Sequence, residues 1–382
     1  MIIWFALIIP IVAAIICFIF YKREVIWWEI AILMCVSFLF IFGAKLLVDK
    51  YKYQEEEYWG TYVTMVCYEE PWIEYIHSTC TRTYACGTDA NGNTVYCTET
   101  YDCSYYSHHA AEWYIIDNIG ERTDIDRNVF DKLMYKFGNK LWVDMNRELH
   151  YDMEHSQCKN GDMYRATWDG SFARIEPMVS KHTYSNNVVH THSVFNFPEV
   201  SDTLSYLFSK LSPFSSYYNA DAIRGYKING FDEANAVLKK FNALYGHSKE
   251  VRVQIILYYN QPKSVGEQLE WYWKGGNMNE FNVIISLSEL GVVQWVRIIS
   301  WTEVQDLKID ARNMILEQPK FDLINTVWWL GKNIERFQRK DFERDFSYLQ
   351  VDPPVGIVIL IYVIILLVSC GIMYWSIINR ID

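Results

Sequence analysis

Basic residues and the short motifs of common enzyme families are what this sequence lacks. Its 35 Lys and Arg stand against 46 Asp and Glu, which gives a formal net charge of -11 at pH 7. A chain this acidic has no excess of positive charge to bind a phosphate backbone, so the composition argues against nucleic acid as a partner. The sequence contains no P-loop, no G-x-S-x-G and no H-E-x-x-H motif, so no such signature indicates a reaction.

Apolar residues are abundant and concentrated. The 15 Trp, 28 Tyr and 20 Phe exclude an intrinsically disordered chain. Three apolar stretches, Ile2–Phe20, Ile26–Leu47 and Val355–Ile378, exclude a simple soluble enzyme. The first and third carry no charge and are long enough for a hydrocarbon core of about 30 Å. The sequence therefore predicts three transmembrane helices, two before a large domain and one after it.

Alternatives remain open for the first two stretches. Glu29 lies beside Trp27 and Trp28, so its carboxylate either sits at headgroup depth beside an aromatic belt or forms an intramembrane ion or proton site. Residues 2–20 alternatively form a cleavable signal peptide, although no basic residue precedes them and Pro10 interrupts their middle.

The positive charges predict the orientation in the membrane. Lys22 and Arg23 follow the first span, so the positive-inside rule places this loop in the cytoplasm. The second span then runs outward, and Asp49–Pro353 is extracytoplasmic. The C-terminus is cytoplasmic, in agreement with Arg380. We therefore expect an integral protein of the cell or inner membrane that contacts the lipid bilayer and has most of its chain outside the cytoplasm.

The cysteines of the large domain predict disulfide bonds. Their number is even and their compartment is expected to be oxidising; they are Cys67, Cys80, Cys86, Cys97, Cys103 and Cys158. Asn91-Gly92 is a strong signal for a two-residue hairpin turn. Folding the chain there places Cys86 opposite Cys97 and Cys80 opposite Cys103, within reach of a disulfide. Cys67 and Cys158 then pair by elimination. A four-cysteine zinc site is the alternative, but the spacings do not match zinc knuckles.

The large domain divides into four segments by composition and pattern. Residues 48–60 contain Glu55-Glu56-Glu57 and predict a solvated stalk. Residues 61–197 predict a β-rich domain stapled by disulfides. Residues 198–230 predict a connector, and residues 231–350 predict an α/β domain.

The last segment alternates between helix and strand signals. The predicted helices are Asp232–Tyr245, Ser264–Trp273, Val304–Glu317 and Phe321–Phe337, and the predicted strands are Val251–Tyr259, Phe281–Leu287 and Val292–Ser300. This order predicts a sheet with helices on both faces, in three layers. The expected fold class is thus an α+β membrane protein with a β-rich part and an α/β/α part.

A family resemblance covers about Glu250–Arg339. The strand Val251–Leu257, the helix that ends at Trp271-Tyr-Trp-Lys-Gly275, the polar turn to Glu280 and the following apolar strands resemble the TPM domain of membrane-anchored extracytoplasmic proteins. The resemblance implies an α/β/α sandwich, and a role either as a phosphatase or as an assembly or maintenance factor for membrane complexes. The family's Gly-rich acidic loop is replaced here by Ile299–Asp306. The whole chain resembles uncharacterised bacterial or phage membrane proteins.

Two sets of residues are candidates for chemistry. His190 and His192 alternate on an expected strand, so both imidazoles, with His182, are candidate metal ligands. Glu280, Glu303 and Asp306 are expected at strand ends, where open sheets bind ligands, and are candidate catalytic carboxylates. The alternatives are polar surface histidines and solvated or helix-capping carboxylates. No cofactor is predicted.

Two functional hypotheses follow. The first is a scaffold or assembly factor whose rigid outer domain binds a partner protein at the membrane surface. The second is a membrane-tethered, phosphatase-like hydrolase built on the α/β part. A pocket with converging carboxylates at the carboxyl ends of the strands favours the hydrolase, and an exposed patch without such a pocket favours binding.

Overall fold

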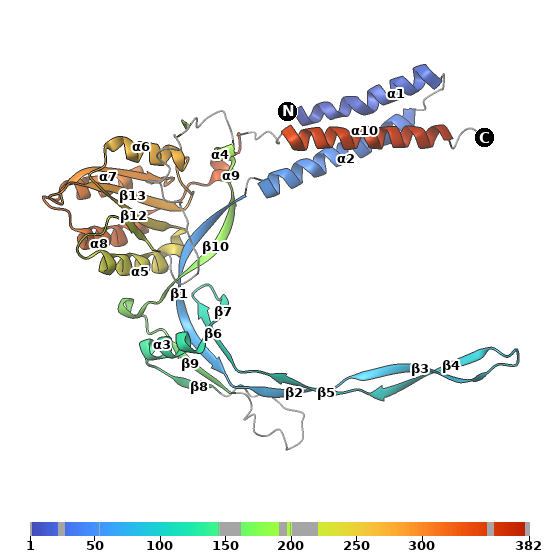
Figure 1. The fold of residues 1–382 in the computed structure, drawn as a ribbon, viewed down its shortest axis with the longest axis horizontal. Helices are drawn as coiled ribbons and strands as arrows, with labels where there is room; N and C mark the ends of the chain where they lie inside the picture. Colours follow the sequence, from blue (N-terminus) through green and yellow to red (C-terminus); the bar gives the residue numbers. More distant parts are fainter. Residues whose placement is uncertain are drawn as a thin grey trace.

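The computed structural model describes residues 2–21, 27–52, 54–143, 145, 162–190, 197, 198, 200, 221–349 and 355–378. Figure 1 shows an apolar helix bundle, a β-rich body that carries a long arm, and an α/β part. A pair of long strands runs from the helix bundle to the β-rich body, and the α/β part lies beside this pair. The protein is therefore mixed α+β, as predicted.

Apolar helices from the two ends of the chain pack together. They are the 3-10 helix η1 (Ile2–Leu7) and the α-helices α1 (Ile8–Tyr21), α2 (Trp27–Lys52) and α10 (Val355–Ile378). Ala6, Ile41 and Ile365 are buried in one cluster between them. Within the described residues, one helical segment, Val355–Tyr374, is long and apolar enough to cross a membrane, and the apolar segments Trp4–Ile16 and Ala31–Leu46 are shorter. One of the three predicted spans is thus a candidate by length.

The β-rich body is built around one long strand. The first half of β1 (Gln54–Glu69) pairs with β10 (Pro177–Ser185), and its second half lies between β6 (Glu112–Asp117) and β9 (Met163–Thr167). The short strands β7 (Arg122–Asp124) and β8 (Leu141–Val143) extend the sheet, and all pairs are antiparallel. Helix α3 (Arg127–Phe137) covers one face with Phe130, Leu133 and Phe137.

The predicted stalk over residues 48–60 is not a separate solvated segment. Helix α2 continues to Lys52 and β1 begins at Gln54. The glutamates lie in a strand, so neighbouring side chains point to opposite faces. Glu56 is exposed and pairs with Lys181, whereas Glu57 is only 1 % exposed and pairs with Arg339. Side chains distant in sequence neutralise this acidic run.

A two-stranded ribbon, called the arm below and comprising residues 72–109, projects from the body (Figure 1). Its base pairs β2 (Trp72–Ile76) with β5 (Tyr105–His109), and its outer part pairs β3 (Thr79–Thr88) with β4 (Thr94–Asp102). Two disulfide bonds join the outer strands, Cys80–Cys103 and Cys86–Cys97, with Cα separations of 5.8 and 5.6 Å. Both predicted hairpin bridges are confirmed.

The register of this hairpin differs from the prediction. Cys80 lies opposite Tyr101 and Tyr84 lies opposite Cys97, so the bonded cysteines are diagonal neighbours. The turn is longer than two residues: Asp89 accepts hydrogen bonds from the amides of Asn91 and Asn93, and Gly92 has φ +85°. Cys86 lies at a register shift between Ala85 and Gly87, and Cys103 lies beyond the end of β4. This irregular backbone brings the diagonal pairs within bonding distance.

The third predicted bridge is not formed. Cys67 is a free thiol, fully buried in β1, and burial raises its pKa to about 11. Cys158 lies outside the described residues. The assignment by elimination for Cys67–Cys158 was wrong because a buried cysteine is as stable in a core as a small apolar residue.

The α/β part has the predicted three layers. Its sheet has the order β11 (Ile223–Gly225), β12 (Arg252–Tyr259), β13 (Glu280–Leu287) and β14 (Val293–Ser300); the first three are parallel and β14 is antiparallel. Helix α6 (Lys263–Tyr272) covers one face. The other face packs against α5 (Phe231–Lys249), α7 (Gln305–Leu316) and α8 (Leu323–Asn333).

Strand β11 was missed because it falls in the predicted connector 198–230 and has only three residues, too few for an alternating pattern. Four short helices complete the described elements: η3 (Phe172–Arg174), α4 (Asn187–His190), η5 (Ile334–Arg336) and α9 (Phe342–Asp345).

The β-rich and α/β parts meet where β1 crosses α5. A Cβ atom added at Gly60 would lie 2.0 Å from the Asn242 carbonyl oxygen, and one added at Gly246 would lie 2.4 Å from the Gly60 nitrogen. Close to this contact, the Asn279 side chain donates a hydrogen bond of 2.8 Å to the Tyr58 carbonyl. Strand and helix backbones touch directly, which only glycine permits.

Replacing Gly60 with alanine is expected to destabilise the protein by about 1–3 kcal/mol, because a methyl group there must push the two backbones apart. The matched control is Gly87→Ala in the arm, where no atom lies within 4 Å of the added Cβ. Chemical unfolding of the detergent-solubilised full chain measures both. Equal midpoints for the two variants would contradict this packing.

Candidate functional site

The three predicted catalytic carboxylates do not form one site. Glu280 is the first residue of β13, is 1 % exposed, and lies at the amino ends of the parallel strands rather than the carboxyl ends. It accepts hydrogen bonds from Gln254 Nε2 (2.9 Å) and Asn282 Nδ2 (3.1 Å). Burial raises the pKa of Glu280. These contacts make it a structural residue of the sheet face.

Glu303 and Asp306 are exposed residues near the start of α7. Glu303 accepts a hydrogen bond of 3.0 Å from Arg344 Nη2, and Asp306 occupies the first turn of the helix, where a carboxylate complements the helix dipole. Because Glu280 is buried and these two are exposed, the three side chains do not converge on a common cavity.

The predicted metal ligands are not brought together within the described residues. His182 lies on β10, where its ring stacks on Trp59 at 3.7 Å and its Nε2 is 2.7 Å from Ser180 Oγ. Burial lowers the pKa of His182. His190 ends α4 and its side chain is outside the described set, as is all of His192. In the described part of the chain, no group of three or more His, Cys, Asp or Glu is arranged to hold a metal.

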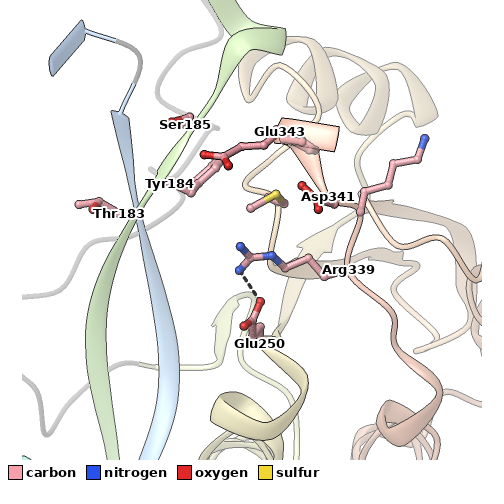
Figure 2. A pocket seen from close by; sticks show the side chains of 10 residues that line it. Thr183, Tyr184, Ser185, Glu250, Arg339, Asp341 and Glu343 are labelled. Carbon is pink, nitrogen blue, oxygen red and sulfur yellow. Dashed lines mark ion pairs between the residues drawn. The ribbon is translucent and has the colours of Figure 1, made fainter. Parts of the chain in front are cut away.

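A pocket of about 390 Å³ opens between β10 and the segment that follows η5. Figure 2 shows its side chains, which come from β10, from the end of α5 and from residues 339–343. Lys340, Asp341 and Glu343 place charges of both signs around the opening. Glu250 and Met278, which precede β12 and β13, locate the pocket at the amino ends of the sheet.

Arg339 is the centre of the ion pairs in the pocket wall. Its Nη1 lies 2.8 Å from Glu57 Oε1 on β1 and 3.0 Å from Glu250 Oε2 at the end of α5. Its guanidinium also lies 5.8 Å from the centre of the Trp59 ring. Burial raises the pKa of Glu57, and the charge of Arg339 opposes that rise. One arginine thus connects the β1–β10 strand pair to the α/β part.

A second pocket, of about 280 Å³, lies at the same end of the sheet near α7. Its one carboxylate, Glu270, forms an ion pair with Arg297, and Lys308 Nζ donates to the Ser300 carbonyl at 3.4 Å. Burial lowers the pKa of Lys308. Neither of these two pockets occupies the carboxyl ends of the strands, where the hydrolase hypothesis places its site.

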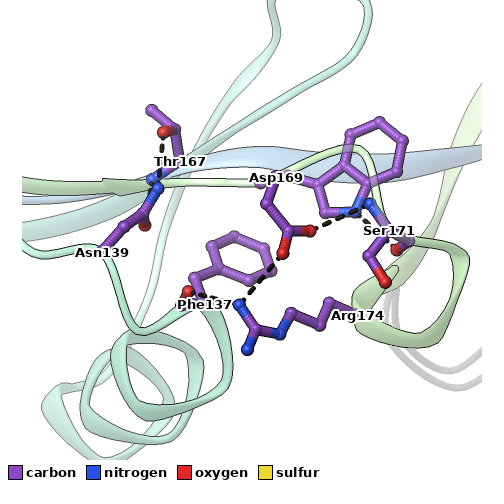
Figure 3. Close-up of polar contacts among 7 residues, drawn as sticks. Phe137, Asn139, Thr167, Asp169, Ser171 and Arg174 are labelled. Carbon is purple, nitrogen blue, oxygen red and sulfur yellow. Dashed lines mark hydrogen bonds and ion pairs between the residues drawn. The ribbon is translucent and has the colours of Figure 1, made fainter.

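A cluster of polar contacts shapes the loop after β9 (Figure 3). Arg174 pairs with Asp169 at 3.0 Å and donates to the Phe137 carbonyl at 3.2 Å, and Asn139 exchanges two hydrogen bonds with Thr167. The ordered loop presents Phe172, whose ring centre lies 4.9 Å from the ring centre of Phe241 in α5. This cluster supplies a second attachment between the β-rich and α/β parts.

The arm carries several exposed tyrosines. Tyr96 is 68 % exposed and Tyr105 is 55 % exposed, and Tyr84 and Tyr101 are also exposed. One face of β3 and β4 presents threonines in facing pairs, Thr81 with Thr100 and Thr83 with Thr98, together with Tyr96, whereas Tyr84 and Tyr101 lie on the face of the disulfides. The sequence analysis missed this surface. The sequence does contain a signal for it, because β3 and β4 have no alternating apolar residues and such strands have no face that packs on a core.

Removing Arg339 is expected to weaken the attachment of the β1–β10 strand pair to the α/β part. Arg339→Met leaves Glu57 buried without its cation and should cost about 3 kcal/mol at pH 8. Since burial raises the Glu57 pKa above its unfolded value, the cost should shrink as the pH falls and the carboxyl group binds a proton. Glu57→Gln/Arg339→Met should recover much of the loss and show no such pH dependence.

The matched control is Arg336→Met, which breaks an exposed pair with Asp310 and should cost well under about 1 kcal/mol. Urea unfolding of the full chain at pH 5 and pH 8 measures all four proteins. A loss for Arg339→Met that is independent of pH would contradict the assignment of Glu57 as the uncompensated group.

Comparison with known proteins adds no relative from which a role can be carried over. No family model matches the chain, and the comparisons with curated proteins and with solved structures found no match.

Proposed function

We propose that the protein is a membrane-anchored scaffold or assembly factor that holds a partner protein near the outer surface of the membrane. In this proposal all three apolar helical segments cross the bilayer, the loop after α1 and the C-terminus are cytoplasmic, and residues 54–349 are extracytoplasmic. Helix α2 has 26 residues, about 39 Å at 1.5 Å per residue, which exceeds a hydrocarbon core of about 30 Å. The two disulfides suit an oxidising compartment.

The observation that carries the proposal is the exposed arm on a doubly anchored body. The β1 strand begins two residues after α2, and α10 follows the α/β part. The β-rich body and the α/β part together are therefore attached to the helix bundle at both ends. Figure 1 shows the arm and the helix bundle extending from the body toward the same side. Because residues 54–349 lead into the helix bundle at both ends, the arm stays near the membrane, which suits a protein that positions a neighbour there.

The α/β part serves as the rigid support in this proposal. Its resemblance to the TPM domain is kept as a proposal for an assembly role rather than for phosphatase activity. The support for that choice is the state of the three carboxylates: Glu280 is buried in hydrogen bonds, and Glu303 is paired with Arg344. The two pockets lie at the amino ends of the strands, where an open sheet does not place its ligand.

The proposed orientation is tested by thiol labelling in intact cells. Cysteines are introduced singly at Glu24 and Asn91 in a variant in which Cys17, Cys35, Cys67, Cys158 and Cys370 are replaced by serine. We expect an impermeant maleimide to label position 91 and to spare position 24, while a permeant reagent labels both. The reverse pattern would overturn the orientation.

The scaffold function is tested by photo-crosslinking in native membranes. A benzophenone amino acid at Tyr96 should give one dominant protein adduct, because this side chain lies on the exposed arm. The matched control places the same group at Tyr135, which is 91 % exposed but lies on α3 in the body. Identical adducts at the two positions, or none at Tyr96, would contradict a binding arm.

The hydrolase hypothesis is tested in the same preparations with generic phosphomonoesters and Mg²⁺, Ca²⁺ or Mn²⁺. Robust turnover that Glu303→Ala or Asp306→Ala abolishes would replace the scaffold function.

A further inference from the structure

Among the described residues, the outer strands of the arm, β3 and β4, have no strand partner at their outer edges. Within the part of the chain that the structure describes, they pair only with each other, and β2 pairs only with β5. In a two-stranded ribbon, each strand directs a row of amide and carbonyl groups away from its partner. Such a row is a template on which another extended chain can form a ladder of hydrogen bonds.

The arm also lacks the residues that usually protect an open edge. Residues 72–109 contain no proline and no lysine. Their single arginine, Arg82, forms an ion pair of 3.0 Å with Glu99. The facing threonine pairs leave one side of the ribbon uncharged over several residues. A strand added at either edge would place its own side chains next to these threonines, and β-branched side chains favour such strand neighbours.

The disulfides hold the arm in an extended form that can pair with another strand. A two-stranded ribbon without a core is marginally stable in water. The bridges Cys80–Cys103 and Cys86–Cys97 bond β3 to the β4 side near both ends of the outer ribbon. Both strands are therefore held extended before a partner arrives, which reduces the conformational entropy lost on binding.

We infer that the arm adds an extended segment of its partner as a third strand beside β3 or β4, and that this segment is neutral or basic. The charge selects this occupant. The arm has four carboxylates, Glu74, Asp89, Glu99 and Asp102, against one arginine, a net charge of -3. Two copies of the arm would repel each other, whereas a lysine-bearing strand is attracted. The inference rests on the proposed scaffold function and specifies how its arm binds.

The probes for the test are three ten-residue peptides. The first alternates Lys and Val, the second alternates Glu and Val, and the third is the Lys-Val peptide with its backbone amides N-methylated at alternate residues. The third peptide keeps every side chain and charge but cannot donate hydrogen bonds along one edge. Binding to the full chain in lipid nanodiscs is measured by fluorescence anisotropy, and hydrogen exchange reports which amides become protected.

We expect the Lys-Val peptide to bind and to slow amide exchange in β3 or β4. The N-methylated peptide should bind at least about tenfold more weakly, because each lost backbone hydrogen bond weakens the complex. If the peptide adds beside β4, Thr98→Lys should weaken Lys-Val binding about two- to fivefold, while Thr98→Glu should not weaken it. Thr83→Lys and Thr83→Glu make the same comparison for β3, and Tyr135→Lys on α3 is the control that should change nothing.

Several results would overturn the inference. Equal binding of the methylated peptide would mean attraction between charges without an added strand. Arm protection that grows with protein concentration and needs no peptide would mean pairing with a second copy. Failure of all three peptides, together with an adduct at Tyr96 in native membranes, would reject strand addition and leave the scaffold function standing. Absence of that adduct would reject the scaffold function itself.

Discussion

The contact between β1 and α5 is the constraint on which the rest of the structure depends. Gly60 and Gly246 let a strand of the β-rich body touch the backbone of a helix in the α/β part. Arg339 closes the contact by neutralising Glu57, a carboxylate that the strand buries. Loss of either feature would weaken the contact between β1 and α5, because a side chain at Gly60 would clash and an unpaired charge would resist burial.

This contact gives the arm a fixed base. The ribbon of β1 and β10 is held against the α/β part by Gly60 and Arg339, and the loop that carries Phe172 holds it a second time. The same β1 strand continues into the sheet from which the arm projects. A surface on the arm is therefore positioned relative to the α/β part through packed elements, while the disulfides maintain the outer ribbon.

The sequence predicted the hairpin disulfides although it predicted the wrong register. Cys80 and Cys86 are separated by the same number of residues as Cys97 and Cys103, so one hairpin brings both pairs close together whether they are opposed or diagonal. The three layers of the α/β part were predictable for a similar reason. The apolar runs of β12 and β13 indicate strands buried on both faces, and such strands need helices on each side.

The candidate sites were less predictable because their chemistry depends on contacts between distant residues. Glu280 is a possible acid in the sequence, but in the fold it is a buried hydrogen-bond acceptor of Gln254 and Asn282. Cys67 is one of six cysteines in the large domain, yet its burial near the end of β1 keeps it as a free thiol. Local pattern cannot assign such roles, since each depends on what packs against the side chain.

The sequence by itself determined the elements: apolar helices at the two ends, a cysteine hairpin and an alternating α/β part, because each follows from local periodicity or spacing. Only the tertiary structure decided that Glu57 is buried beside Arg339, which is 282 residues away in the chain. It also decided that the threonine strands of the arm remain uncovered. Burial and exposure are properties of the packed molecule, so a strand pattern alone cannot distinguish a face that packs from a face that is open.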